Sequence, residues 1–278
     1  MRLRSLLFAP GDRPERFEKA LASGADAVIL DLEDSVAPLN KPKARESVHE
    51  FILHHAGETP LLIRINPLAS PEFESDLAAL SGLHPFAIVL PKAEGAASVL
   101  KLAGSLASAI PILPIATETP SAIFEIGSYR DVSTSLCGLT WGAEDLPAAM
   151  GATTARRTDG RYTPPYELAR SLTLFGAHAA AVPAIDTVYP DFRDLNGLRA
   201  YVGRARRDGF SGMMAIHPSQ VEVINHAFTP DASEVAWAEK VAAAFAARPD
   251  AGVIQLDGRM LDLPHLKLAL RLLEISGR

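Results

Sequence analysis

The chain has 278 residues, of which 48% are hydrophobic and 22% are charged, which is typical of a globular protein and excludes a disordered or fibrous one. Its net charge of -6 argues against binding to a phosphate backbone, so no nucleic-acid partner is expected. The single cysteine excludes an internal disulfide, and no apolar stretch approaches the roughly 20 residues that span a bilayer. We therefore expect a soluble cytoplasmic protein with no membrane partner.

Eight short apolar runs recur along the chain, each followed by a longer polar or amphipathic stretch. They are Ser5–Pro10, Ala27–Glu33, Leu61–Asn66, Phe86–Lys92, Ile112–Glu118, Ser135–Gly142, Ile185–Tyr189 and Gly212–His217. Strands buried on both faces form continuous apolar runs, and their alternation with helices implies parallel pairing through right-handed crossovers. Eight such units predict a TIM barrel over residues 1–228. The alternative is an open doubly wound sheet, but the first turn, Pro10–Pro14, lacks the Gly-rich loop expected there.

Residues 229–278 follow the eighth unit and predict a C-terminal helical extension. The segment Asp231–Ala247 predicts a helix, because Glu234 has the spacing of a capping box from the first residue. The segment Leu263–Ser276 predicts a second helix with one apolar face, and Ala251–Leu261 between them predicts a loop or a short hairpin with an Asp-Gly turn. We expect this extension to pack on a neighbouring subunit or across one mouth of the barrel.

The active sites of such barrels lie at the C-terminal ends of the strands. The polar residues there are Glu33 and Asp34, Arg64 and Asn66, Lys92, Glu118, Asp145, Tyr189 and His217. Glu118 and Asp145 follow neighbouring strands about 4.8 Å apart, so both carboxylates can reach one cation. Two carboxylates without Cys or paired His suit Mg²⁺ better than Zn²⁺. The alternative interpretation is structural, with Glu118 beside the dipole of the next helix and Asp145 as a helix cap.

Arg64 lies inside an apolar run, where a guanidinium is costly unless it meets an anion. That anion is either Glu33 or Asp34 on the neighbouring strand, or a substrate carboxylate held by two hydrogen bonds. The acids Asp31, Glu33 and Asp34 would repel one another unless Arg64, a cation or bound protons relieve them. Period-2 alternation places Asp31 and Glu33 on one face and Asp34 on the other.

At these residues the sequence resembles the β-subunit of citrate lyase and the related malyl-CoA and citramalyl-CoA lyases, which belong to the HpcH/HpaI aldolase superfamily. The matching segments are LLFAPGDRPERFEKAL (Leu6–Leu21), ADAVILDLEDSVAPLNKPKAR (Ala25–Arg45), LLIRINP (Leu61–Pro67), VLPKAE (Val89–Glu94), IATETPSAI (Ile115–Ile123), LTWGAEDL (Leu139–Leu146), AIHPSQ (Ala215–Gln220) and DGRMLDLPHL (Asp257–Leu266). The resemblance spans the chain nearly end to end. It implies a TIM barrel, Mg²⁺ as the cofactor and a coenzyme A thioester as the substrate.

The resemblance also implies roles for individual residues. Glu118 and Asp145 would be the Mg²⁺ ligands, with Glu118 also at the substrate, and Arg64 would grip the carboxylate or carbonyl of the acyl unit. The segment that contacts coenzyme A in the family contains Phe8, Arg13 and Lys19.

Asp262 matches an acid that transfers a proton in related lyases and comes from the tail of a neighbouring subunit. The alternative is an ordinary N-cap, because Asp262 stands two residues before Pro264 at a predicted helix start.

The function implied is Mg²⁺-dependent cleavage of a carbon–carbon bond in a 3-hydroxy-3-carboxylate acyl thioester of the citryl-, malyl- or citramalyl-CoA type. The products would be an acetyl thioester and a 2-oxo acid. Three alternatives remain: an acyl-CoA thioesterase at the same metal site, a class II aldolase acting on free 2-oxo acids, and a non-catalytic binding or assembly subunit. The aldolase is weakened because Asp34 stands where those enzymes carry a histidine. The thioester is on coenzyme A or an acyl-carrier protein, and a homo-oligomer, a trimer or larger, is expected.

Overall fold

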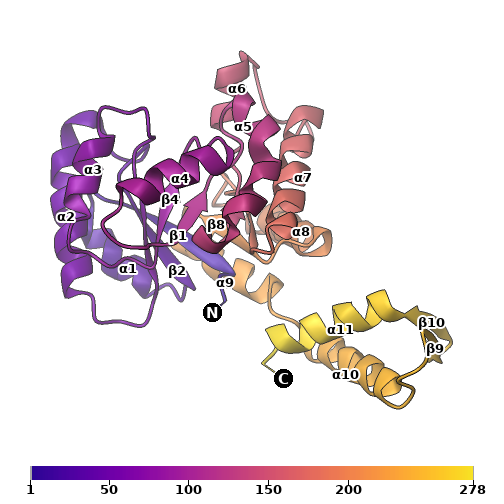
Figure 1. Ribbon diagram of the computed structural model, residues 1–278. Helices are drawn as coiled ribbons and strands as arrows, with labels where there is room; N and C mark the ends of the chain where they lie inside the picture. The colour runs from indigo at the N-terminus through magenta and orange to yellow at the C-terminus, as the bar shows by residue number, and fades with distance from the viewer. Residues whose placement is uncertain (1, 278) are drawn as a thin grey trace. The chain divides into compact units, whose positions relative to one another are not determined.

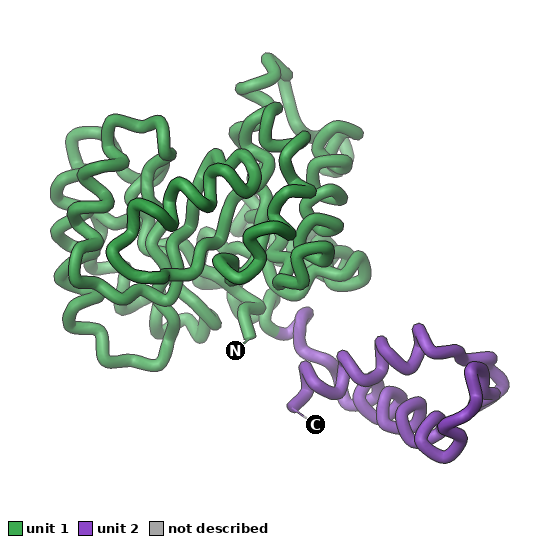
Figure 2. The backbone as a smooth tube through the Cα atoms, viewed as in Figure 1, with its two compact units in different colours: residues 1–225 green, residues 226–278 purple. Residues whose placement is uncertain are grey.

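The computed structural model describes residues 2–277. The described residues form two compact units, which meet between residues 225 and 226 of the chain (Figure 2). Within the described part of the chain, no helix is both long and apolar enough to cross a membrane.

The first unit is a barrel of eight parallel strands with helices between them (Figure 1). The strands are β1 (Ser5–Pro10), β2 (Ala27–Asp31), β3 (Leu61–Arg64), β4 (Ala87–Leu90), β5 (Ile112–Pro114), β6 (Leu139–Thr140), β7 (Ala184–Asp186) and β8 (Gly212–Ala215). Their order is β5-β4-β3-β2-β1-β8-β7-β6, and two isolated parallel bridges, Ile112 to Leu136 and Ile115 to Thr140, join its two ends. The predicted TIM barrel is confirmed.

Helices fill the connections of the first unit. They are α1 (Phe17–Leu21), α2 (Lys41–His54), α3 (Phe73–Ala79), α4 (Gly95–Ser105), α5 (Pro120–Glu125), α6 (Asp145–Met150), α7 (Pro164–Ala179), α8 (Leu195–Asp208) and α9 (Pro218–Ala227), with 3-10 helices η1 (Pro14–Arg16), η2 (Pro38–Asn40) and η3 (Ile126–Ser135). Most strands end one to several residues before the predicted run does, because the polar residues that close each run turn into the following loop. Those loops carry the site described below.

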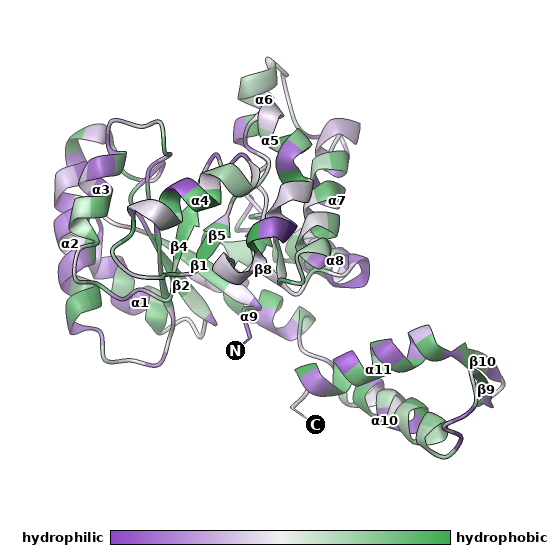
Figure 3. Cartoon of the chain, in the orientation of Figure 1, coloured by the Kyte–Doolittle hydropathy of each residue, from purple (hydrophilic) through white to green (hydrophobic). Residues whose placement is uncertain are grey.

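Alternate residues of the strands form the core of the barrel. They include Leu6, Ile29, Leu62, Val89, Leu113, Ile185 and Met214, all buried. Side chains of alternate strand residues point to the same face of a sheet, so one set fills the barrel interior and the other contacts the helices. Each fully buried aliphatic side chain contributes about 1.5–3 kcal/mol relative to exposure. Figure 3 shows the resulting hydrophobic strands.

The second unit has its own small core. It contains α10 (Ala232–Ala246), the antiparallel strands β9 (Val253–Leu256) and β10 (Arg259–Asp262), and α11 (Leu263–Ile275). The predicted capping box is present: the Glu234 amide donates to Asp231 Oδ1 over 2.9 Å, and the Asp231 amide donates to Glu234 Oε2 over 2.8 Å. The hairpin turns at Asp257-Gly258, both with positive φ, as a tight two-residue turn requires.

Gly212 is where β8 passes closest to the start of the chain, and it generates a prediction about barrel closure. An added Cβ at Gly212 would lie 1.9 Å from the Leu3 carbonyl oxygen, which is backbone and cannot rotate away. Gly212→Ala is expected to destabilise the protein by about 1–3 kcal/mol or more, measured by urea unfolding. Gly203→Ala, in the middle of α8 with ordinary space around it, is the control and should stabilise by about 0.5–1 kcal/mol. Equal effects of the two substitutions would contradict the prediction.

Candidate active site

A pocket of about 540 Å³ opens at the C-terminal ends of the strands. The predicted site residues that line it are Phe8, Lys19, Arg64, Glu118 and Asp145. The pocket thus brings together the predicted metal ligands, the predicted acyl-binding arginine and two of the three residues predicted to contact coenzyme A.

Arg64, the last residue of β3, forms a two-point ion pair with Asp31, the last residue of β2. Arg64 Nε lies 2.7 Å from Asp31 Oδ1, and Nη2 lies 2.7 Å from Oδ2. The register that pairs Asp31 with Arg64 across the two strands produces this contact. Burial raises the pKa of Asp31, but the charge and hydrogen bonds of Arg64 outweigh burial and hold that pKa below its ordinary value.

The other contacts of Arg64 fix its orientation. Its Nη1 lies 3.0 Å from Glu33 Oε2, and its guanidinium carbon lies 4.8 Å from the centre of the Phe8 ring. Of the acids expected beside Arg64, Glu33 is therefore a direct partner, while Asp34 lines the pocket. Because a guanidinium has five N–H groups and these acids face three of them, two remain for a ligand.

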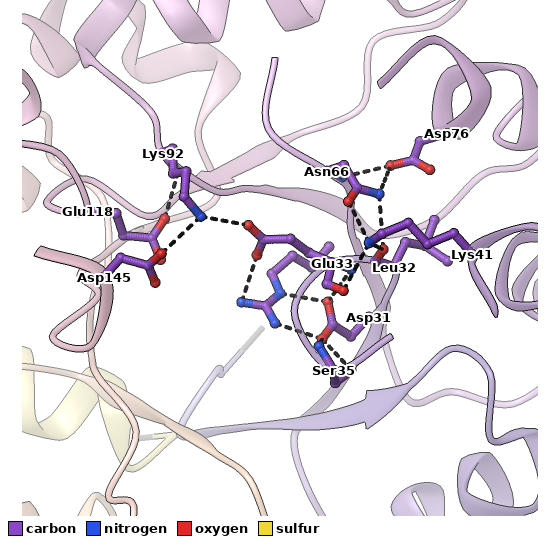
Figure 4. Close-up of polar contacts among 11 residues, drawn as sticks. Asp31, Leu32, Glu33, Ser35, Lys41, Asn66, Asp76, Lys92, Glu118 and Asp145 are labelled. Atoms are coloured by element: carbon purple, nitrogen blue, oxygen red, sulfur yellow. Dashed lines mark hydrogen bonds and ion pairs between the residues drawn. The ribbon is translucent and has the colours of Figure 1, made fainter. Parts of the chain in front are cut away.

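Behind this pair, a buried lysine holds the turn that follows β2. Lys41 Nζ donates to the Leu32 carbonyl over 2.8 Å, to the Glu33 carbonyl over 3.1 Å and to Asn66 Oδ1 over 2.7 Å (Figure 4). Asn66 in turn donates through its backbone and side-chain nitrogens to Asp76, each over 2.7 Å. Because Lys41 and Asn66 hydrogen-bond the backbone carbonyls of this turn, the turn has little freedom to move Glu33.

Lys92 connects the acids of the site, a role that sequence reasoning did not assign to it. Its amide donates to Glu118 Oε2 over 2.6 Å, and its Nζ lies 2.9 Å from Glu33 Oε1 and 3.0 Å from Asp145 Oδ1 (Figure 4). Lys92 has φ of 50°, a left-handed conformation uncommon outside glycine, which aims the amide at Glu118. The sequence feature that could have indicated this role is the position of Lys92, directly after a proline at the end of the fourth apolar run.

Glu118 is buried deeply enough to change its acidity. Burial raises the pKa of Glu118 to about 8, the hydrogen bond from the Lys92 amide opposes the rise, and the charges of Glu33 and Asp145 add to it. Burial also raises the pKa of Glu33, although Arg64 and Lys92 work against that shift. A Cβ added at Gly142 would lie 2.7 Å from Glu118 Cγ and 2.8 Å from Oε1, so only glycine leaves room for this carboxyl group.

The charges and donor atoms fit a hard divalent cation. The four carboxyl groups Asp31, Glu33, Glu118 and Asp145 face two basic groups, Arg64 and Lys92. When all are ionised, the excess is two negative charges, which one divalent cation balances. Residues 2–277 contain no cluster of three or more His, Cys, Asp or Glu side chains arranged to hold a metal, so water and substrate would supply the other ligands of a cation at Glu118 and Asp145. Mg²⁺ is commonly held in this way.

Two predicted residues lie elsewhere. Arg13 does not line the pocket: its side chain is 58% exposed, with Nε 3.9 Å from Asp12 Oδ1. Arg16, which sequence reasoning did not single out, lines the pocket together with Lys19.

Asp262 belongs to the second unit, where it directly precedes α11 and its carboxylate lies 2.5 Å from His265 Nδ1. The hydrogen bond to His265 lowers the pKa of this exposed acid. The position of Asp262 at the start of α11 agrees with the N-cap interpretation.

The raised pKa of Glu118 predicts how stability depends on pH without metal. The folded protein keeps a proton on Glu118 up to about pH 8, whereas the unfolded chain releases it near 4.5. The contribution of Glu118 to the free energy of unfolding is therefore complete below pH 4.5. It falls as the pH rises towards 8, by up to about 1.4 kcal/mol per pH unit. In EDTA, Glu118→Gln should remove this component from urea unfolding curves measured between pH 5 and 8.

Asp131→Ala, an exposed acid on η3, is the matched control and should keep the wild-type slope. A Glu118→Gln variant whose stability depends on pH as steeply as the wild type would contradict the raised pKa.

Known proteins are similar to this chain in sequence and in fold. The profile of the family described as HpcH/HpaI aldolase/citrate lyase matches residues 4–218. The chain is 38% identical to the citrate lyase subunit beta-like protein of Mycobacterium tuberculosis, over 98% of this chain and 94% of that protein. It is 31% identical to a (3S)-malyl-CoA thioesterase of Cereibacter sphaeroides, over 96% of this chain and 92% of that protein.

A crystal structure of CitE from Mycobacterium tuberculosis, in complex with magnesium, acetoacetate and coenzyme A, is similar with a TM-score of 0.84 and 37% sequence identity. The similarity covers 99% of this chain and 98% of that one. Sequence and structure agree over nearly the whole length, and the chain belongs to the HpcH/HpaI aldolase/citrate lyase family.

Proposed function

We propose that this protein is a Mg²⁺-dependent carbon–carbon lyase that cleaves a 3-hydroxy-3-carboxylate acyl-CoA thioester to acetyl-CoA and a 2-oxo acid. The observation that carries the proposal is the pairing of Glu118 and Asp145 beside Arg64 in one pocket of about 540 Å³. A substrate with a hydroxyl group and a carboxylate can bind a cation held by the two acids, and the arginine can bind the acyl unit. Membership of a family named for aldolases and citrate lyase favours cleavage over hydrolysis.

Glu118 and Asp145 would hold the cation. When bound, Mg²⁺ supplies a Lewis acid that polarises the hydroxyl and carboxylate oxygens of the substrate. Arg64 would bind the acyl unit through the two N–H groups that Asp31 and Glu33 leave free, and Asp31 keeps the guanidinium in position before the substrate arrives. Phe8, which lies under the guanidinium, would limit where the acyl chain can run.

The coenzyme A part of the substrate is anionic because of its phosphates. Arg16 and Lys19 line the same pocket on the side of α1, and they are the groups we propose for these phosphates. Arg13, exposed on the neighbouring turn, remains a candidate for the same role at the rim.

A base takes the hydroxyl proton as the carbonyl of the 2-oxo acid forms and the carbon–carbon bond breaks. This leaves an enolate of the thioester, whose carbon must receive a proton. Asp262 is our proposed proton-transfer residue, and we propose that it acts from a neighbouring copy in a trimer or larger homo-oligomer. The support is that Asp262 lies in a different unit from all residues that line the pocket, beside exposed apolar side chains such as Met260 and Leu263. We also propose the cytoplasm as the place of the reaction, because the chain has one cysteine and no disulfide.

Turnover of candidate substrates tests the proposed reaction. Purified protein with Mg²⁺ is expected to convert malyl-CoA, citramalyl-CoA or citryl-CoA into acetyl-CoA and the matching 2-oxo acid, detected by mass spectrometry. EDTA should reduce kcat/KM by at least about a hundredfold, because it removes the cation. The substitution Asp145→Ala should have an effect of the same size, because the cation loses one of its two carboxylates. Asp131→Ala should keep wild-type activity.

The products discriminate among the alternatives. Free coenzyme A with an intact hydroxy acid would identify a thioesterase instead of a lyase. Turnover of free 2-oxo acids alone would identify an aldolase. Full activity of Asp145→Ala would overturn the metal assignment.

Mixing two inactive variants tests the role of Asp262. Asp262→Asn should lose turnover yet bind cation normally. When it is co-expressed with Asp145→Ala, random assembly should restore about a quarter of wild-type activity, since some pockets then combine an intact Asp145 with an intact Asp262 of a neighbour. Activity that stays absent in verified mixed oligomers would show that Asp262 does not act between copies.

A further inference from the structure

Lys92 contacts both of the proposed metal ligands, Glu118 and Asp145. Its Nζ lies 3.0 Å from Asp145 Oδ1, while its amide holds Glu118 Oε2 at 2.6 Å. Both proposed metal ligands are thus bound to the same residue, one through the side chain and one through the backbone.

A divalent cation and an ammonium group compete for Asp145. Two positive charges on one carboxylate repel each other in a partly buried site. Each therefore weakens the binding of the other to Asp145.

The structure shows where the ammonium can go. Lys92 Nζ also lies 2.9 Å from Glu33 Oε1, and the Glu33 side chain is buried and fixed by Arg64 and by the Lys41 contacts to the adjacent carbonyls. The ammonium can leave Asp145 and keep this second partner. The Lys92 side chain is 32% exposed, so its head can rotate while the backbone stays on Glu118.

We propose that Lys92 is a tethered counter-ion of the acidic site and that its ammonium competes with the divalent cation for Asp145. This inference rests on the proposed function, because it takes Glu118 and Asp145 as the metal ligands. Two consequences follow. The Lys92 ammonium reduces the repulsion among the acids, and it weakens the affinity of the site for free cation. Tight cation binding then requires the carboxylate and hydroxyl oxygens of the substrate as additional ligands.

The test measures cation binding without turnover. Mn²⁺ is titrated into the wild-type protein, Lys92→Met, Lys92→Gln and the control Lys101→Met, and free Mn²⁺ is measured by electron paramagnetic resonance. Lys101 is an exposed lysine of α4 and should bind as the wild type does. Both Lys92 variants are expected to bind Mn²⁺ at least about tenfold more tightly, because a competing positive charge is gone.

Thermal unfolding supplies a second readout. In EDTA, both Lys92 variants should melt below the wild type, since Glu33 and Asp145 lose a counter-ion, and saturating Mn²⁺ should raise their Tm by more than it raises that of the wild type. Lys92→Gln keeps a hydrogen-bond donor on a side chain one atom shorter and removes the charge, so it reports on charge if Lys92→Met does not fold.

The outcomes separate this inference from the proposed function. Wild-type binding that Asp145→Ala abolishes, together with unchanged or weaker binding by folded Lys92 variants, would overturn the competition and leave the metal site standing. Binding by neither wild type nor Lys92 variants would overturn both. Tighter binding by the two Lys92 variants but not by Lys101→Met supports the exchange.

Discussion

Arg64 ends β3 with its guanidinium bonded at two nitrogens to the carboxylate of Asp31, and the other contacts of the pocket are arranged around that pair. A buried ion pair stabilises little by itself, since desolvation consumes most of the Coulomb attraction. Its value here is orientation. Asp31 satisfies one edge of the guanidinium, Glu33 contacts a third nitrogen, and Phe8 covers a face, so the donors that remain point in a fixed direction before any ligand binds.

Charge balance links this pair to the other half of the pocket. The positive charges of Arg64 and Lys92 balance two of the four carboxyl groups. Burial raises the pKa of Glu118 to about 8, so this carboxyl group is neutral at lower pH. Two negative charges remain after Arg64 and Lys92 are counted. A proton on Glu118 offsets one of them and a divalent cation offsets both. Because a cation at Glu118 displaces that proton, cation binding near neutral pH should release protons, as metal sites with protonated ligands do.

The sequence predicted the eight strands, the barrel and the tail hairpin because these follow from local patterns: apolar runs of strand length and an Asp-Gly turn. It placed Glu118, Asp145 and Arg64 at one mouth because parallel strands end on one side. It did not predict the role of Lys92 or of Lys41, since their contacts depend on where long side chains of different loops converge. The expectation of Glu33 beside Arg64 is confirmed, but the two-point pair with Asp31 was not expected, because it depends on the strand register. The six-residue helix α6 is too short to show a period, and the sequence indicated it only through the alternative interpretation of Asp145 as a helix cap.

The backbone at Lys92 has a consequence for how this protein can change through mutation. A φ of 50° is adopted most easily by glycine, so the residue best suited to the turn is not the residue that stands there. Lys92→Gly would keep an amide for Glu118 and relax the backbone, but it would discard the ammonium that balances Glu33 and Asp145. Backbone conformation and charge therefore act in opposite directions at this position, and the charge of the pocket favours a lysine over the glycine that the turn alone would select.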